Sequence, residues 1–200
     1  INIVIATDEE EEEEEEYIGG YYNLIQRFRP EYDFDKLEKV VKEMTYNLNK
    51  VIDYNYYSVN KAEISNARHR PVGLGLMGFQ DALYKLSIPY SSDEAVKFAD
   101  ETMEYISYFA IKASTDLAEE RGKYESFDGS LWSQGILPID SIHLLEQQRQ
   151  KYISVDKTYN LDWKTLRERV RTVGMRNSNT MAIAPTATIS NITGVTQSIE

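Results

Sequence analysis

The chain has 200 residues, of which 42% are hydrophobic and 28% charged, a composition typical of a globular protein with a real core. It has no cysteine, which excludes disulfides, thiolate metal sites and thiol chemistry carried by this chain. Nine consecutive acids, Asp8 to Glu16, supply most of the net charge of −11. Without them, 24 of the 33 acidic residues remain against 22 basic ones, so the body lacks the basic excess that binding to nucleic acid requires.

The first 30 residues are treated as a separate, unassigned segment. Ile1 to Thr7 is a candidate short strand, and the acidic run after it is interpreted as a solvated loop, or alternatively as an interaction tail. The chain begins at Ile1 without Met and without a basic n-region, which indicates an internal segment rather than a secretory signal. No apolar run approaches the roughly 20 residues that cross a bilayer, so we expect a cytoplasmic protein with no membrane partner.

A long amphipathic helix is predicted to begin near Asp33 or Asp35. Either aspartate can cap it, and Glu38 stands close to capping-box spacing from Asp35. The apolar positions that recur at steps of four and three are Leu37, Val41, Met44, Leu48 and Val51. The pattern ends at Tyr54 to Tyr57.

Gly73, Gly75 and Gly78 match the letters of a dinucleotide-binding fingerprint. Such a fingerprint should follow a buried strand, whereas Arg68 to Pro71 precede this one. We therefore favour a close-packed segment in which glycine lets two backbones approach. A dinucleotide-binding enzyme remains the alternative.

Two helices are predicted next, at residues 79–86 and from a capping box formed by Ser91 and Glu94. The second has one apolar stripe: Val96, Ala99, Met103, Ile106, Ala110, Ala113 and Leu117. Its late alanines favour close packing by a neighbour, and Gly122 is its expected C-cap. The stripe is too short to favour a coiled coil.

The rest of the chain is predicted to alternate between loops and helices. Residues 124–137 are interpreted as a structured loop and residues 140–151 as a polar helix. Asp162 is expected to cap a last helix that stops at Gly174. The apolar residues on one face of that helix are Trp163, Leu166, Val170 and Val173. The two histidines, His69 and His143, lie far apart in sequence and are interpreted as structural.

The end of the chain carries the candidate site. Thr180 to Ala184 is a candidate buried strand that Pro185 ends, because proline has no N–H for a ladder. Hydroxyls then gather at Thr186, Thr188 and Ser190, before a possible helix start. Hydroxyls and free backbone N–H groups together suit a phosphate, although the same residues also fit an ordinary Ser/Thr-rich cap.

The visible elements are mostly helices with one clear strand. A lone strand cannot satisfy its own backbone edges, so it must join a sheet whose other strands lie elsewhere. We therefore expect the chain to be part of a larger α/β fold.

Several groups of residues together resemble the large, catalytic subunit of class I ribonucleotide reductase. In this sequence they are residues 32–37, 47–53 with 56–57, 66–78, 112–114 with 116–119, 134–138, 176–178, 185–188 and 198–200. They stand in the family's order and at its spacing over residues 31–200. The resemblance implies that these residues are part of the family's catalytic domain, a ten-stranded α/β barrel.

The resemblance also implies an activity. The family replaces the 2′-OH of a ribonucleoside diphosphate with hydrogen through a protein thiyl radical, and so supplies deoxyribonucleotides for DNA replication. Its partners are a metal-containing small subunit that generates the radical, thioredoxin or glutaredoxin, and a second large subunit. ATP and deoxynucleotide effectors bind elsewhere in the family. The turn that matches Pro185, Thr186, Ala187, Thr188 and Ile189 holds the substrate diphosphate.

The departures from the family bear on activity. The catalytic cysteines are absent, and the finger loop and radical-transfer tyrosines would lie outside these residues. We therefore expect no catalytic, cofactor-binding or metal-binding residue in this chain, and no ribonucleotide reduction by it alone. Thr186→Val is expected to weaken diphosphate binding with little loss of stability. A helical interaction module with an acidic tail is the alternative from another class.

Overall fold

Helices make up most of the chain that the structure describes. The computed structural model describes residues 31–199. These form two units: residues 31–36, 76–98 and 184–199 are called the loop unit, and residues 37–75 and 99–183 the core unit. The interpretations made above of residues 1–30 concern residues outside those described.

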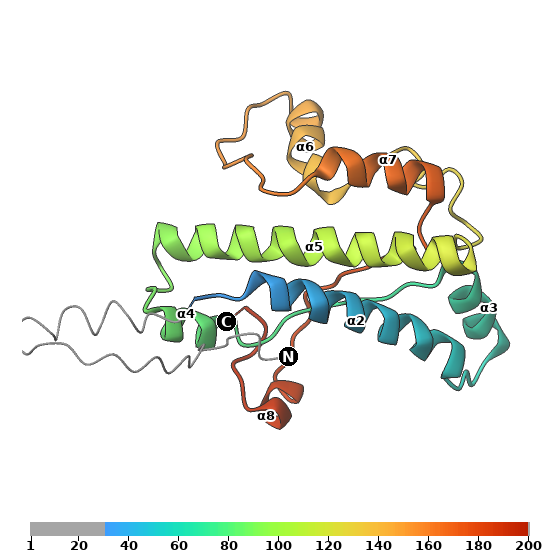
Figure 1. Cartoon of the computed structure of the whole chain (residues 1–200), viewed down its shortest axis with the longest axis horizontal. Coiled ribbons are helices and arrows are strands. Elements are labelled where there is room, and N and C mark those ends of the chain that lie inside the picture. Colours follow the sequence, from blue (N-terminus) through green and yellow to red (C-terminus); the bar gives the residue numbers. More distant parts are fainter. Residues whose placement is uncertain (1–30, 200) are drawn as a thin grey trace, which may run out of the picture. The chain divides into compact units, whose positions relative to one another are not determined.

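The helix α2, Phe34–Tyr54, confirms the first predicted helix and its start near Asp33, but corrects its buried face (Figure 1). Asp33 caps it, since its Oδ1 accepts the N–H of Lys36 at 2.8 Å. The Asp35–Glu38 box was therefore wrong. The buried positions of α2 recur at steps of four: Leu37, Val41, Thr45 and Asn49. Val51, predicted to be apolar core, is 56% exposed.

The helix α3, Asn60–His69, was missed by the sequence analysis. No residue of α3 is buried, and no side chain caps its N-terminus. It therefore carries neither the apolar stripe nor the capping signal by which a helix is found in a sequence.

The helices α4, Phe79–Leu86, and α5, Asp93–Arg121, were both predicted, but the start of α5 needs a correction. The cap is Ser92, whose Oγ accepts the N–H of Ala95 at 3.1 Å. The capping box assigned to Ser91 and Glu94 was therefore one residue out of register. Val96, placed on the apolar stripe, is 68% exposed.

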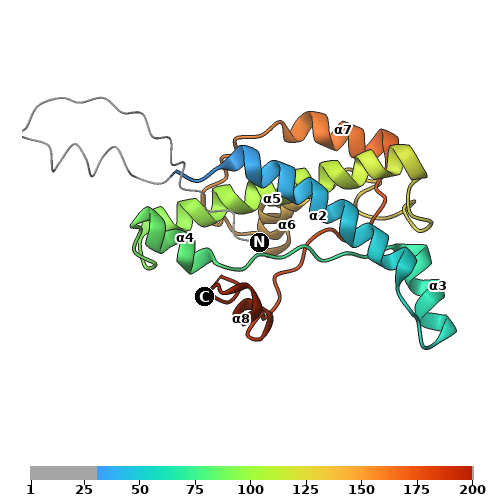
Figure 2. The same ribbon diagram turned by 60° about the horizontal axis from the view of Figure 1, so that its bottom comes forward.

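The C-terminal part of α5 is the central element of the core unit. Ala110, Ala113 and Leu117 are buried as predicted, and Gly122 ends the helix with a positive φ of 83°. Figures 1 and 2 show α2 running along α5, and the ammonium of Lys42 lies 5.5 Å from the centre of the Phe109 ring. Full burial of Ala110 and Ala113 is as expected of small residues in a closely packed helix.

The remaining helices follow the predicted order. They are a 3-10 turn η1, Pro138–Asp140, then α6, Ser141–Arg149, α7, Trp163–Val173, and α8, Ile189–Thr193. Asp162 caps α7 by accepting the N–H of Thr165 at 3.0 Å, and Gly174 follows its last residue, as predicted. Residues 124–137 form the expected loop of successive turns.

One hydrophobic cluster holds α5, α7 and the loop between them together. Its buried members are Ile111, Tyr124, Phe127, Leu137, Trp163, Leu166, Val170 and Met175. The rings of Tyr108 and Trp163 add an edge-to-face contact at 5.3 Å between centroids. Three of the four residues predicted for the apolar face of α7, Trp163, Leu166 and Val170, belong to this cluster, whereas Val173 is half-buried.

The predicted buried strand Thr180–Ala184 is present only as an extended segment, and it is not buried throughout, since Ile183 is 48% exposed. It pairs in parallel with residues 72–74 through one β-bridge, between Leu74 and Met181. The bonds run from the N–H of Val72 to Asn179 O, of Leu74 to Thr180 O, and of Ala182 to Leu74 O, at 3.0 to 3.1 Å. Among residues 31–199 no longer strand forms, because a single neighbour cannot extend the pairing into a sheet.

The glycines before α4 allow this pairing. A Cβ on Gly75 would stand 2.6 Å from the carbonyl oxygen of Ala182, and one on Gly73 would stand 3.0 Å from the Ala182 side chain. The close approach predicted for the glycine-rich segment is thus confirmed, and it is an approach of one backbone to another.

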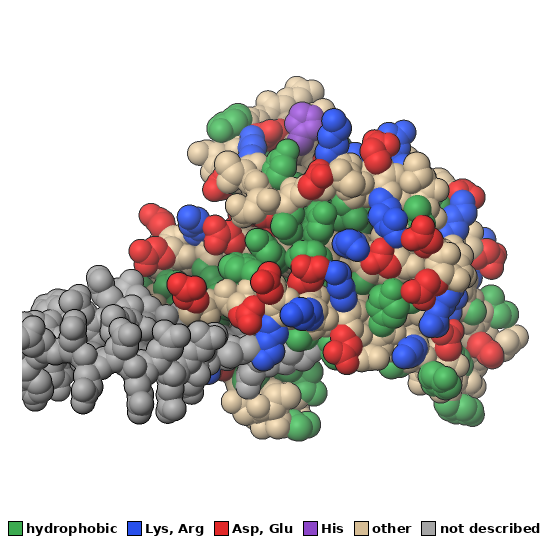
Figure 3. Space-filling model, viewed as in Figure 1, with side chains coloured by type: hydrophobic (Ala, Val, Ile, Leu, Met, Phe, Trp, Pro, Cys, Tyr) green, Lys and Arg blue, Asp and Glu red, His purple; other side chains and the backbone are tan. Residues whose placement is uncertain are grey.

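The surface carries both signs of charge. Figure 3 shows acidic and basic side chains interspersed over the face in view, as the near-neutral balance outside the acidic run predicts. Within residues 31–199, no helix has the length and apolar character needed to cross a membrane.

Candidate functional site

The five candidate residues lie in the loop unit, at the turn that leads into α8. Thr186 is buried, whereas Pro185, Ala187, Thr188 and Ile189 are exposed. Thr188 stands directly before α8, and its side chain makes no capping bond to the helix. Thr188 is therefore open to solvent, whereas Thr186 is mostly covered by the surrounding chain.

The buried hydroxyl of Thr186 is oriented by a backbone group. Its Oγ1 accepts the N–H of Ser198 at 2.8 Å. Its carbonyl oxygen accepts the N–H of Ser190 at 2.9 Å, which starts the turn into α8. Because Ser198 occupies a lone pair of the oxygen, the hydroxyl proton of Thr186 is directed elsewhere and can be donated.

The segment that holds Thr186 is itself held by α4. Thr196 donates its N–H to Oδ2 of Asp81 at 2.8 Å, and its carbonyl accepts the N–H of Gly78 at 2.9 Å. The hydroxyl of Tyr90 also donates to the carbonyl of Ile199, at 3.2 Å. None of Asp81, Thr196 and Tyr90 was predicted as a site residue, since no local pattern in the sequence indicates which loop an aspartate in the first turn of a helix will contact.

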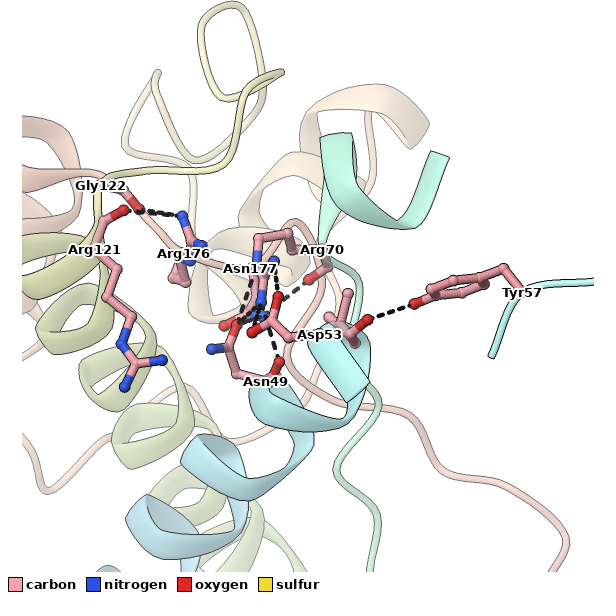
Figure 4. Close-up of polar contacts among 9 residues, drawn as sticks. Asn49, Asp53, Tyr57, Arg70, Arg121, Gly122, Arg176 and Asn177 are labelled. Carbon is pink, nitrogen blue, oxygen red and sulfur yellow. Dashed lines mark hydrogen bonds and ion pairs between the residues drawn. The ribbon is translucent and has the colours of Figure 1, made fainter. Parts of the chain in front are cut away.

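A second polar cluster lies in the core unit and gathers four of the matched motif groups, three of which are drawn in Figure 4. Asn177 donates from Nδ2 to the carbonyl of Arg70 at 2.9 Å and to Oδ1 of Asn49 at 3.2 Å. Its Oδ1 accepts the hydroxyl of Ser114 at 2.9 Å, and its own N–H donates to that Oγ at 3.0 Å. Groups far apart in the sequence thus form one buried network around the start of the extended segment.

Arg70 is the charged centre of this network and is only 5% exposed. It lies in the left-handed region with φ 45°, which costs a non-glycine residue about 1 kcal/mol or more. Its guanidinium makes five hydrogen bonds to Asn49 and Asp53, including a bidentate pair on the carboxylate at 2.8 and 2.9 Å. The guanidinium of Arg70 lowers the pKa of the Asp53 carboxyl through these bonds, which outweigh partial burial.

Arg176 caps the end of α5. Its Nη1 donates to the carbonyls of Arg121 and Gly122 at 3.1 and 3.0 Å (Figure 4), the place where a cation best meets the unpaired carbonyls of a helix. Burial, and then the nearby charge of Arg70, lower the pKa of Arg176. The matched residues 176 and 177 therefore tie the chain that leads to the candidate site to both α5 and α2.

The histidines take structural positions. Nδ1 of His69 lies 2.5 Å from the hydroxyl of Ser126, and Nε2 of His143 lies 2.9 Å from the side chain of Gln147. Across residues 31–199, no three His, Cys, Asp or Glu side chains are grouped so that they could hold a metal ion.

A cavity of about 380 Å³ opens in the core unit. Its lining is mostly apolar and includes Trp132, Leu137, Leu144 and Met181. The indole N–H of Trp132 donates to the carbonyl of Ser178 at 2.8 Å, so the cavity borders the extended segment. None of the five candidate residues lines it.

Comparison with known proteins agrees with the motif groups. The family described as "Ribonucleotide reductase, barrel domain" matches residues 20–200. The chain is 52% identical over 183 residues to the ribonucleoside-diphosphate reductase subunit alpha of Chlamydia muridarum, which covers 90% of this chain and 18% of that protein. It is 44% identical over 173 residues to the large subunit from Trypanosoma brucei brucei (84% and 20%) and 43% identical over 170 residues to the large chain from Schizosaccharomyces pombe (85% and 20%).

The chain therefore belongs to the ribonucleotide reductase barrel-domain family. Within that family its relatives are large, or alpha, subunits of ribonucleoside-diphosphate reductase, which confirms the resemblance expected from the motifs. The family description implies an α/β barrel, and the part described here is mostly helical. The chain spans about a fifth of the length of these relatives.

Proposed function

We propose that this chain acts as part of a ribonucleoside-diphosphate reductase large subunit and contributes the turn that holds the substrate diphosphate. The names of its relatives support the reaction class. In this proposal residues 31–200 belong to a ten-stranded α/β barrel, and the extended segment at Thr180–Ala184 is one of its strands.

The turn offers neutral donors to an anion. The hydroxyls of Thr186 and Thr188 and the backbone N–H groups of Ala187 to Ile189 are the donors we assign to the diphosphate. The helix α8 has only five residues, so the proposal rests on the hydroxyls and the turn rather than on a helix dipole. Hydrogen bonds to a charged group contribute roughly 1.5–3 kcal/mol each.

The observation that carries the assignment is the contact between Ser198 and Thr186. The N–H of Ser198 fixes the buried Oγ1 of Thr186, so that this oxygen is pre-oriented as a donor. An ordinary Ser/Thr-rich cap would instead use its hydroxyl oxygen to accept N–H groups of the following helix, and Thr188 makes no such bond.

The other parts of the reaction would come from outside this chain. We propose that the intact enzyme uses a small radical-generating subunit with its metal, thioredoxin or glutaredoxin, a second large subunit, and ATP or deoxynucleotide effectors bound elsewhere. No cysteine is present in this chain, so the thiols that the family's reaction needs are not among its residues. No step of the chemistry is assigned to them.

The sharpest test is Thr188→Val in the native polypeptide that carries this sequence. Thr188 is exposed and caps nothing, so we expect its loss to weaken ribonucleoside-diphosphate binding about tenfold without changing the thermal midpoint. Isothermal titration calorimetry measures the affinity. Thr188→Ser keeps the hydroxyl and should bind like the parent. Equal affinity in the valine and serine variants would contradict the assignment.

Thr186→Val is expected to change stability as well as affinity, which the sequence alone does not indicate. It would remove the acceptor of the Ser198 N–H, and an unpaired buried N–H costs about 1–3 kcal/mol. We therefore now expect this variant to lose both affinity and stability, while Thr186→Ser should retain both.

A further inference from the structure

Asp81 lies outside the five candidate residues but contacts the segment that follows them. It lies in the first turn of α4, where an aspartate would ordinarily face the helix N-terminus. Instead its Oδ2 accepts the N–H of Thr196 at 2.8 Å, 115 residues along the chain. The N–H of Gly78 donates to the carbonyl of the same residue at 2.9 Å. Both backbone groups of Thr196 are therefore held by the start of α4.

The held residue is two positions from the one that orients Thr186. Ser198 is buried, and its φ of 39° is in the left-handed region that a non-glycine residue avoids. Its N–H nevertheless donates to Oγ1 of Thr186 at 2.8 Å. A strained residue keeps such a conformation only where its surroundings fix it, and the bonds at Thr196 and Ile199 fix the chain on both sides of Ser198.

We propose that Asp81 is a positioning residue for the diphosphate turn. Its carboxylate holds Thr196, Thr196 sets the place of the Ser198 N–H, and that N–H orients the hydroxyl of Thr186 toward the substrate. This inference rests on the proposed function of the turn. The role we assign to Asp81 is that of a hydrogen-bond acceptor for the Thr196 N–H. Its negative charge is not part of this role, because a carboxylate and a diphosphate repel each other.

If Asp81 acts as a hydrogen-bond acceptor, two substitutions at this position should have different effects. Asp81→Ala removes the acceptor and frees Thr196, whereas Asp81→Asn keeps an oxygen that can accept the same N–H. Asp93→Ala is the matched control, since it removes an exposed acid from the first turn of α5, and none of the hydrogen bonds described at the turn involves Asp93. All three are made in the native polypeptide that carries this sequence.

We expect Asp81→Ala to raise the KM for a ribonucleoside diphosphate five- to tenfold and to leave kcat at saturation within twofold. Asp81→Asn should have the KM of the parent, and so should the control Asp93→Ala. A purely structural role for Asp81 would lower the active fraction and hence kcat, with KM unchanged. That result, or a KM in Asp81→Asn as high as in Asp81→Ala, would overturn the proposal.

The Thr188→Val variant separates two hypotheses: that the turn binds the diphosphate, and that Asp81 positions the turn. If Thr188→Val weakens diphosphate binding and Asp81→Ala does not, the turn binds the diphosphate and Asp81 does not position it. If neither variant changes diphosphate affinity, the proposed function of the turn fails and the inference fails with it.

Discussion

At the scale of single residues, members of separate motif groups contact one another in the folded chain. Asn49, Arg70 and Asn177 belong to three groups that the sequence presents as separate, and the structure joins them in one buried network. The bonds among them tie α2 to the residue after α3 and to the chain before the extended segment, so these three residues are structural supports. The oxygen Oδ1 of Asn49 alone receives donors from both other residues, which fixes the orientation of its amide.

The ion pair between Arg70 and Asp53 predicts a pH dependence of stability. The pKa of Asp53 is lowered in the folded state, so the pair stabilises the protein above the unfolded pKa, about 3.9. This contribution is lost as the pH falls through the lower folded value. Chemical denaturation should therefore show Asp53→Asn less stable than the parent at pH 7, with the difference shrinking below about pH 4.

The control for that comparison is Asp128→Asn. Asp128 pairs with Lys123 at 2.7 Å, but its side chain is 81% exposed, and such surface pairs contribute little. We expect its effect on the free energy of unfolding to be small at both pH values. A difference for Asp53→Asn that stays constant down to pH 3 would show that the charge of Asp53 is not what stabilises the network.

At the scale of elements, helix ends and buried faces were each predicted only in part. Asp162 and Gly122 stand where capping chemistry predicts them, because a cap is satisfied within one turn of chain. The stripes depend on which neighbour a helix meets. In α2, Thr45 and Asn49 are buried, whereas Val51 is exposed.

The corrected start of α5 gives a prediction at this scale. Ser92 accepts the N–H of Ala95 and donates to the carbonyl of Pro89, so Ser92→Ala should lower the free energy of unfolding by about 1 kcal/mol. Ser91→Ala changes the residue that the sequence pattern favoured and should cost almost nothing. Urea denaturation of both variants measures this, and equal losses would restore the earlier assignment.

At the scale of the whole molecule, the missing thiols limit what the chain can do. The family's reaction, as the resemblance implies it, needs a cysteine for the radical and a cysteine pair for electrons, and this sequence has no cysteine. We predict that the purified 200-residue chain, given a ribonucleoside diphosphate, thioredoxin and a small subunit, forms no deoxynucleotide. Chromatography of the nucleotides measures this. Turnover above the background without the chain would show that the thiols are not needed.

The sequence by itself determined the helices with clear caps, the near-neutral body and the family, since each of these is encoded by spacings within one segment or by motifs in order along the chain. The structure alone decided which segments meet. It paired Gly75 with Ala182, joined Asn49 to Asn177 and placed Thr196 on Asp81. The last two contacts span 128 and 115 residues. Such contacts depend on how whole elements pack, because a donor and its acceptor far along the chain leave no shared pattern in the sequence around either of them.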